Sequence, residues 1–242
     1  MIKRLFDFTA SLIGLIVFSP IILIFLLLVF LQDFKSPFYV APRMRTPDSK
    51  FRMVKIRSMV SNADKIGGTS TSNTDRRITW VGQVIRKFKI DEITQLYNVL
   101  LGQMSLVGPR PQTLQDARLY SDVENRLFDA RPGITDLSSI VFADEGSILA
   151  GSENPDLKYN QVIRPWKSRL GLLYVEKQNV LLDIRIICTT LVGIVSREAA
   201  LRSVVSMLRG LGAEEQLIEV AARKTELVPF PPPGMDAVET RT

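Results

Sequence analysis

The sequence contains no histidine and a single cysteine, and both shortages narrow the chemistry open to it. Without histidine, the chain cannot build a Ser-His-Asp or Cys-His catalytic set, a histidine zinc site or imidazole acid–base catalysis. The lone Cys188 allows no intrachain disulfide, and its place in an apolar helical run favours a small core residue over a nucleophile. Any catalysis must therefore use carboxylates, lysine, arginine, hydroxyl groups or a metal ion held by oxygen.

The 242 residues carry a formal net charge of +6, from 31 Lys and Arg against 25 Asp and Glu. This length is enough for one soluble domain beside a membrane anchor. The excess of positive charge indicates anionic partners, such as lipid head groups, phosphorylated substrates or nucleic acid. Nucleic acid is the weakest of these, because the basic residues are dispersed and no recognised nucleic-acid motif accompanies them.

An uncharged apolar run, LIGLIVFSPIILIFLLLVFL, extends from Leu12 to Leu31. A helix of about 20 such residues is long enough to cross the hydrocarbon core of a bilayer. Ser19 and Pro20 lie near its middle, where the missing proline N–H predicts a bend or a break. No small-x-small cleavage site follows before Lys35, so we expect the run to remain as an anchor.

Basic residues flank this run on both sides, with Lys3 and Arg4 before it and Lys35, Arg43 and Arg45 after it. The positive-inside rule therefore draws both ends toward the cytoplasm. Two topologies fit the residues about equally: a re-entrant hairpin that enters and leaves by one face, and a kinked span with its N-terminus outside. In the first, we expect Lys3 and Arg4 to reach lipid phosphates at the interface.

Four segments are predicted, in an α+β protein that is mainly helical with little strand. Residues 1–35 are the membrane anchor and residues 36–196 a compact cytoplasmic domain. Residues 197–227 are an amphipathic helical extension, and residues 228–242 a proline-rich tail that is flexible or lies along the surface. Within the domain, we predict an extended linker over 36–50, a basic-faced strand over 51–59, a helix over 78–103, short helices and turns over 109–133, and helix over 157–196 with a break at Pro165.

Adjacent carboxylates, Asp91 and Glu92, open the strongest helical pattern of the domain, directly after a basic run. The positive end of a helix favours ionised acids. An ionised aspartate beside Lys and Arg can attack phosphorus, and its neighbour can hold a hard cation through oxygen. Taken alone, however, such a pair is more often ordinary charge at a helix start.

Arg110 stands between Pro109 and Pro111, which limit its backbone freedom. The planar guanidinium suits phosphate or carboxylate, although an isolated Pro-Arg-Pro is more often a stiff surface turn. Four further basic residues are candidates for a diphosphate-binding surface, with solvated charge as the equal alternative for each: Lys55, Arg57, Arg77 and Arg86.

Seven short motifs follow one another in order through residues 1–196. They are Lys3-Arg4-x-x-Asp7, Ser19-Pro20, Phe51-x-x-x-Lys55-x-Arg57-Ser58-Met59, Asp75-x-Arg77-x-Thr79, Asp91-Glu92-x-x-Gln95-Leu96-x-Asn98-Val99, Gly102-x-Met104-Ser105-Leu106-Val107-Gly108-Pro109-Arg110-Pro111 and Arg131-Pro132-Gly133-Ile134-Thr135. In this order they strongly resemble the bacterial sugar transferases, also called monotopic phosphoglycosyl transferases, which start the assembly of membrane-linked glycans.

The resemblance implies transfer of a sugar 1-phosphate from a UDP-sugar to polyprenyl phosphate, of which undecaprenyl phosphate is the expected form, with release of UMP. Carried over, Asp91 is the nucleophile that forms a covalent phosphosugar intermediate, and Glu92 helps to bind Mg²⁺. Arg110 shapes the site and binds substrate. The Ser19-Pro20 break makes the membrane helix re-entrant and places a monotopic enzyme on the cytoplasmic face of the bacterial inner membrane. The implied partners are the two substrates and membrane phospholipids, with a homodimer left open and no nucleic acid.

Three departures from the family pattern stand out. Family members usually carry proline at Thr94 and an acid at Gln103, so one candidate metal or structural ligand is missing here. After Thr135 many members continue with Gly-Leu-Ala, whereas this chain has Asp136-Leu137-Ser138 and then the segment 142–146, Phe-Ala-Asp-Glu-Gly, and we expect sugar selection to reside in this variation. A non-catalytic, membrane-anchored adaptor with a basic face is the competing hypothesis.

Overall fold

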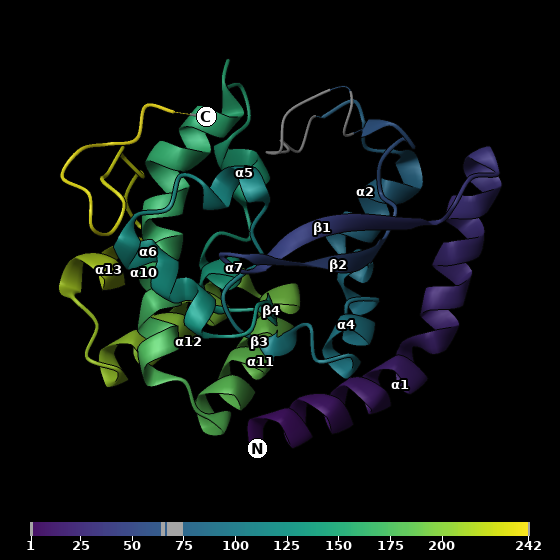
Figure 1. Ribbon diagram of the computed structural model, residues 1–242, viewed down its shortest axis with the longest axis horizontal. Helices are drawn as coiled ribbons and strands as arrows, with labels where there is room; N and C mark the ends of the chain where they lie inside the picture. The colour runs from purple at the N-terminus through teal and green to yellow at the C-terminus, as the bar shows by residue number, and fades with distance from the viewer. Residues whose placement is uncertain (1, 64–65, 67–74, 242) are drawn as a thin grey trace.

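The computed structural model describes residues 2–63, 66 and 75–241, and most of these residues are helical. The two sheets in this part of the chain have two strands each. Figure 1 shows a long N-terminal helix that borders the remaining helices, with a β-hairpin across the middle of the molecule. The predicted mainly helical α+β architecture with little strand is confirmed.

Helix α1 (Ile2–Asp33) is continuous and contains Pro20. Figure 1 shows its axis bent near the middle, so the predicted break is a bend within one helix. Proline lacks the N–H that would bond to the carbonyl four residues earlier, which is that of Ile16. Ser19 Oγ donates to this same Ile16 oxygen at 2.8 Å. The serine therefore satisfies the carbonyl that the proline leaves free.

Both ends of α1 are joined to the other elements, whereas its middle exposes large apolar side chains. Near the start, the fully buried Asp7 accepts hydrogen bonds from Ser105 Oγ at 2.8 Å and from the Leu106 amide at 3.1 Å. Near the end, Val29 is buried in an apolar cluster, and Asp33 pairs with Arg57. In the part of the chain that the structure describes, α1 is the one helix long and apolar enough to cross a membrane.

An antiparallel hairpin follows, formed by β1 (Phe38–Thr46) and β2 (Ser49–Ile56). Strand β2 overlaps the predicted strand over 51–59, but it begins two residues earlier and ends three residues earlier. Strand β1 corrects the prediction of a linker over 36–50, which relied on the prolines of that segment. Both strands of a two-stranded hairpin are edge strands. Proline is tolerated on such a strand where its nitrogen faces away from the partner strand and no N–H is needed for pairing.

The predicted helix over 78–103 is divided into three: α2 (Trp80–Lys87), α3 (Ile90–Ile93) and α4 (Leu96–Leu100). Lys89 adopts a left-handed conformation with φ of 54°, which ends the first run of helical hydrogen bonds. Asp91 and Glu92 therefore begin a new helix, as predicted, but that helix is a single turn with little dipole to offer them.

The stretch after α4 contains short elements only, as predicted: β3 (Ser105–Val107), α5 (Leu114–Ala117), α6 (Asp122–Asn125), the 3₁₀ helix η2 (Arg126–Asp129) and β4 (Gly133–Thr135). Strands β3 and β4 pair in parallel. Gly108 and Gly133 lie so close that a Cβ on Gly133 would be 2.1 Å from the Gly108 nitrogen. Only glycine fits this crossing, which fixes the loop carrying Arg110.

The C-terminal half is a helical layer: α7 (Leu137–Val141), α8 (Glu145–Ile148), α9 (Pro155–Lys158), the π-helical turn η3 (Tyr159–Ile163), α10 (Arg164–Lys177), α11 (Val180–Val195), α12 (Arg197–Gly210) and α13 (Glu215–Ala221). Pro165 lies in the first turn of α10, where the predicted break falls. The main apolar core is here, with the fully buried Leu170, Tyr174, Ile186 and Leu208 at its centre.

Residues 222–241 form no helix or strand. Within them, the proline-rich tail contacts α10. The Phe230 ring lies 4.5 Å from that of Trp166, and the buried Glu239 carboxylate is 3.5 Å from Arg164 Nη1. Of the two expectations for this tail, its position in the structure matches the one that follows the surface.

Cys188 is exposed, which corrects its prediction as a core residue. Helix α11 buries Leu182, Asp183, Ile186 and Thr189 on one face, and Cys188 falls on the opposite face. That opposite face is also apolar, so the hydropathy of the segment does not reveal which side is buried.

Candidate functional site

Asp91 and Glu92 share one cation from the hairpin. Lys55 of β2 places its Nζ 3.4 Å from Asp91 Oδ2 and 3.6 Å from Glu92 Oε1. The two carboxylate side chains are 14% and 15% exposed, so they are shielded but open to a ligand on one side. The predicted pair and the predicted Lys55 therefore meet in one place.

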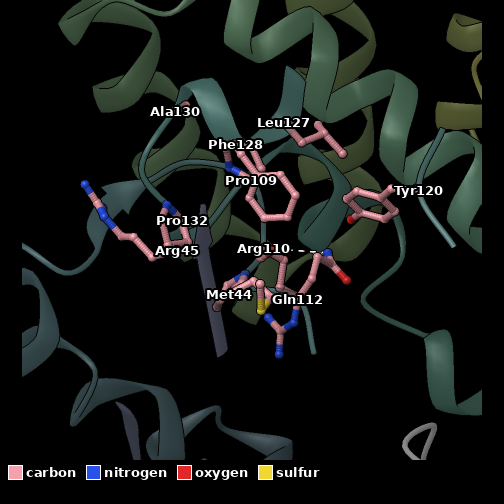
Figure 2. Close-up of a pocket in the computed structure, with 11 residues that line it drawn as sticks. Met44, Arg45, Pro109, Arg110, Gln112, Tyr120, Leu127, Phe128, Ala130 and Pro132 are labelled. Carbon is pink, nitrogen blue, oxygen red and sulfur yellow. Dashed lines mark hydrogen bonds between the residues drawn. The ribbon is translucent and has the colours of Figure 1, made fainter. Parts of the chain in front are cut away.

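Arg110 joins the same group from the Pro-Arg-Pro loop, with its Nη2 donating to Glu92 Oε1 at 3.1 Å. Figure 2 shows its side chain pointing away from Phe128 and Leu127, which line the pocket behind the loop. That pocket has an accessible volume of about 10 Å³, which is too small for a sugar or a nucleotide. A ligand of Arg110 must therefore lie on the side of Glu92.

The cations around Glu92 control its ionisation. Burial alone raises the pKa of this carboxyl, but Arg110, Lys55 and Lys89 outweigh burial and lower the pKa to about 2. The Arg110 guanidinium has its pKa raised, first of all by Glu92. The site therefore holds opposite charges close together at neutral pH, as binding of an anionic substrate with a cation requires.

Two polar side chains attach the Asp91 turn to β2. Thr94 Oγ1 lies 3.1 Å from the Asp91 carbonyl oxygen and 3.3 Å from that of Val54. Asn98 accepts from the Val54 amide at 3.0 Å and donates to the Arg52 carbonyl at 2.7 Å. Thr94, which stands where the family usually has proline, thus provides a hydrogen bond that proline cannot.

Gln103, at the position of the usual acid, has a place in the same junction. Its Oε1 accepts from Asn98 Nδ2 at 2.7 Å, and its carbonyl accepts from Arg45 at 3.1 Å. An acid here would also accept from the Asn98 amide. The sequence left two roles open for this position, as a metal ligand or as a structural residue, and the arrangement fits the structural role.

Two of the other predicted substrate-binding residues are paired with acids. Arg57 binds Asp33 through Nη1 at 2.7 Å and Nη2 at 2.6 Å, which ties the end of α1 to β2. Arg77 binds Asp75 in a similar way, with Nη2 at 2.7 Å from Oδ2. Arg86 is half-buried on α2 and has Asp75 and Glu145 among its electrostatic neighbours. Arg86 thus lies in the electrostatic field of Glu145.

Lys3 and Arg4 point into the protein, which differs from the expected contact with lipid phosphates. Lys3 Nζ lies 2.5 Å from Asp183 Oδ2 and 3.2 Å from the Tyr174 hydroxyl. Arg4 Nη2 donates to the Leu100 carbonyl at 2.7 Å. The buried Asp183 requires a cation, and Lys3 supplies it. From the sequence, no role was predicted for Asp7, which is part of the first motif, or for Asp183, although each is a lone acid in an apolar stretch.

An apolar cavity of about 340 Å³ lies between α1 and the Asp91 turn. Thr94 and Tyr97 bound it on one side, one helical turn after Asp91, and β1 and β2 contribute a residue each. Its six lining residues are Leu15, Ile22, Phe38, Val54, Thr94 and Tyr97. A hydrocarbon chain could therefore approach the carboxylates from the side of α1.

Asp91 and Glu92 are the candidate ligands for Mg²⁺. In the described part of the chain, no group of three or more Asp, Glu, Cys or His side chains is arranged to hold a metal. Mg²⁺, however, is commonly held by one or two carboxylates together with water and substrate phosphates. Lys55 Nζ, placed between the two carboxylates, marks a position that favours positive charge. The donor set fits Mg²⁺ that binds with a phosphorylated substrate.

Comparison with known proteins gives a family match over most of the chain. The model of the family described as bacterial sugar transferase matches residues 1–197. An uncharacterized sugar transferase of Bacillus subtilis, EpsL, is 33% identical over 78% of this chain and 85% of its own length.

Two longer relatives have named activities. The undecaprenyl-phosphate glucose phosphotransferase of Komagataeibacter xylinus is 34% identical over 78% of this chain, and the aligned part is 35% of the relative. A UDP-N-acetylgalactosamine-undecaprenyl-phosphate N-acetylgalactosaminephosphotransferase of Aeromonas hydrophila is 36% identical over 58% of this chain and 34% of its own length. The similarity thus covers the site described above, and the family match ends where α12 begins.

Proposed function

The chain belongs to the bacterial sugar transferase family and is a phosphoglycosyl transferase, and we propose that it transfers a sugar 1-phosphate from a UDP-sugar to a polyprenyl phosphate with release of UMP. Undecaprenyl phosphate is the acceptor named for two of the relatives, and a UDP-sugar is named for one. The product would start the assembly of a membrane-linked glycan. The observation that carries the proposal is the grouping of Asp91, Glu92, Lys55 and Arg110 beside an apolar cavity.

In the first half-reaction, an Asp91 carboxylate oxygen attacks the phosphorus that bears the sugar. The new bond joins Asp91 to that phosphorus, the bridging P–O bond breaks, and its electron pair leaves with UMP. Lys55 and Arg110 lower the repulsion between the carboxylate and the diphosphate, because both place cationic nitrogens within 4 Å of the acid pair. The product of this step is a covalent phosphosugar on Asp91.

In the second half-reaction, a phosphate oxygen of the polyprenyl phosphate attacks the same phosphorus. The Asp91–phosphorus bond breaks, the carboxylate is restored, and the sugar leaves as a polyprenyl diphosphate. Mg²⁺, held through Glu92 with Asp91, would offset the charge of the phosphates when bound. Because soluble and lipid substrates react in turn, the mechanism predicts ping-pong kinetics.

The geometry of α1 supports a re-entrant, monotopic anchor over a simple crossing. A straight helix of 32 residues is about 48 Å long, which exceeds the hydrocarbon thickness of a bilayer. Yet Asp7 near its start and Asp33 at its end both contact the same domain. A crossing helix would place these two residues on opposite faces of the membrane, whereas a bent helix that dips in and returns keeps both contacts.

A second apolar surface supports the orientation of the domain on the membrane. The outward face of α11 exposes large apolar side chains at helical spacing, and Lys3 joins the start of this helix to α1. Its members are Leu181, Ile184, Leu191, Val192 and Val195. Such a face suits burial in the interface of the cytoplasmic leaflet of the inner membrane, with phospholipids as partners.

The apolar cavity supports a prenyl lipid as the acceptor. Leu15 and Ile22 from the membrane helix bound one side of it, and Thr94 leads directly to the Asp91 turn. A lipid whose first isoprenoid units lie against Leu15 and Ile22 would bring its phosphate to the carboxylates at head-group depth. The cavity is lined mainly by carbon, as such a chain requires.

The test is a UMP-release assay on detergent-purified protein over a panel of UDP-sugars. We expect multiple turnovers only with both Mg²⁺ and polyprenyl phosphate, and at most one equivalent of UMP without the lipid. Asp91→Asn should abolish turnover, whereas Asp129→Asn, at an exposed acid of η2, should not. Normal turnover by Asp91→Asn would refute the nucleophile. Absence of UMP release over the whole panel, with membrane binding intact, would favour the adaptor hypothesis.

A further inference from the structure

The segment 142–146, which departs from the family pattern, is positioned by an ion pair. Glu145, the first residue of α8, forms a short hydrogen-bonded ion pair with Lys167 of α10. Lys167 Nζ also lies 5.2 Å from the centre of the Tyr159 ring. The Glu145 side chain is 31% exposed and that of Lys167 is 13% exposed, so a ligand can reach the pair.

Glu145 lies in the electrostatic field of two basic residues from the site, Arg110 and Arg86. Burial raises the pKa of Glu145, but Lys167 together with Arg110 and Arg86 outweighs it, so the pKa is lowered. Tyr159 lies within the same electrostatic neighbourhood as Arg110 and Glu145. Arg110 thus contacts Glu92 directly, and it has Glu145, which is paired with Lys167, and Asp136 among its electrostatic neighbours.

Two arginines hold this segment in place, and one of them lies beyond the family match. Asp144, next to Glu145, forms an ion pair with Arg197, whose Nη2 lies 2.7 Å from Oδ1, and its Oδ2 accepts a hydrogen bond from Arg223 Nη2 at 3.0 Å. The Arg223 guanidinium also lies 5.6 Å from the Phe142 ring. Arg223 belongs to the part of the chain after residue 197. One of the two cations that fix the divergent segment therefore comes from beyond the matched residues.

We propose that Glu145 and Lys167 are specificity-determining residues that read hydroxyl groups of the transferred sugar, and that Arg223 is a positioning residue for them. This inference rests on the proposed function. A carboxylate can accept hydrogen bonds from two neighbouring sugar hydroxyls, while the ammonium donates to one of their oxygens. Without a sugar, the two charges satisfy each other. Glu145 and Lys167 should therefore favour a hexose that carries unsubstituted hydroxyl groups on the part of its ring remote from the phosphate.

A hydrogen-bonding pair of this kind discriminates against a sugar that lacks the hydroxyl. The analogue lacks the hydroxyl that would bond to the pair, so its complex has fewer hydrogen bonds than that of the hydroxylated sugar, and sites built to bind a hydroxyl reject such analogues. Because Glu145 is partly exposed, we expect a preference of about 100-fold for the hydroxylated sugar, below the range of fully buried sites. The preference should appear in kcat/KM.

The experiment compares kcat/KM for a UDP-hexose with that for its deoxy analogues, in wild-type protein and in Glu145→Gln and Lys167→Met. We expect the preference to fall at least about tenfold in each variant, mainly because kcat/KM for the hydroxylated donor decreases. Glu198→Gln serves as the control, since it removes an exposed ion pair with Arg202 on α12. A wild-type enzyme that turns over, with the same preference in both variants, would overturn this inference and leave the proposed function standing. No turnover of any donor by wild type would overturn both.

The role of Arg223 is tested by the same ratio, that of kcat/KM for the UDP-hexose to kcat/KM for its deoxy analogue. This ratio does not change when a variant merely lowers the fraction of folded enzyme. Arg223→Met should reduce the preference, and Arg223→Lys, which keeps a cation for Asp144, should restore most of it. If Arg223→Met lowers the amount of folded enzyme but leaves the ratio of the remaining enzyme unchanged, the positioning role is refuted. Melting temperatures of the variants identify that case.

Discussion

Arg57 and Asp33 are joined by two hydrogen bonds of 2.7 and 2.6 Å, which fasten the last turn of the apolar helix α1 to the residue that directly follows β2. The guanidinium is nearly buried, whereas the carboxylate is about one-third exposed. The adjacent Lys55 reaches the acid pair from the same strand. The link therefore sets the position of the membrane helix relative to the catalytic residues.

Arg57→Met should weaken the docking of α1. Loss of one partner from a buried ion pair costs about 3–5 kcal/mol, and the exposure of Asp33 should reduce this to about 2 kcal/mol. Thermal unfolding in detergent measures the change. Arg202→Met, at the exposed pair on α12, is the control and should shift stability by less than about 1 kcal/mol. Equal shifts in the two variants would contradict a structural role for Arg57.

The ionisation of Glu92 predicts a dependence of stability on acid. The pKa of this carboxyl falls from its ordinary value of 4.5 to about 2 on folding, so its contribution to stability is complete above pH 4.5. That contribution is lost as the pH falls from 4.5 toward 2. Denaturant unfolding at pH 7 and pH 3.5 should therefore show a larger loss in wild type than in Glu92→Gln, which cannot titrate. Equal losses would rule out the depressed pKa.

Gly133→Ala should disrupt the crossing that fixes the Arg110 loop. The added Cβ would lie 2.1 Å from the Gly108 nitrogen, a backbone atom that cannot move aside easily. We expect a loss of about 3 kcal/mol or failure to fold. Gly210→Ala is the matched control, because a Cβ there meets nothing within 4 Å. Unfolding curves that coincide for the two variants would contradict the close approach.

Both ends of α1 should face the cytoplasm. Single cysteines at Ile2 and Ser36, both exposed positions, can be introduced in a Cys188→Ser background and labelled in sealed inverted and right-side-out vesicles. A re-entrant anchor predicts labelling of both positions from the cytoplasmic side. Labelling from opposite sides would establish the kinked span.

The apolar face of α11 should contribute to membrane binding. Leu181→Gln with Leu191→Gln removes two side chains that are 69% and 58% exposed, which should weaken binding to vesicles without loss of folding. Val228→Gln, at a 61% exposed position of the tail, is the control. Flotation with vesicles of phosphatidylethanolamine and phosphatidylglycerol measures the difference. Unchanged flotation of the double variant would exclude contact of this face with lipid.

The sequence predicted the elements whose pattern is local. The basic-faced strand predicted over residues 51–59 located most of β2, and the break predicted at Pro165 located the start of α10. The ordered motifs also pointed to Asp91, Glu92, Lys55 and Arg110, which the fold brings together from a hairpin, a helical turn and a loop. Such convergence was expected from the family pattern and not from any single motif.

The remainder depends on partners that are distant in sequence. Lys3 and Asp183 are separated by 180 positions, so neither pattern alone could show that one neutralises the other. The position of Cys188 depended on which of two apolar faces of α11 the core would cover. The left-handed Lys89 likewise interrupts a helix whose apolar spacing continues through it.

The hydrogen bond from Ser19 to Ile16 has a consequence for the order in which the protein assembles. A bend whose free carbonyl is satisfied within the helix requires no partner from another element, so α1 can enter lipid already in its final shape. Asp7 and Asp33, which contact the rest of the chain, lie outside the apolar run and can form these contacts after α1 has inserted. Insertion would then precede folding of the catalytic part, and the nascent enzyme would be held at its lipid substrate before its active site exists.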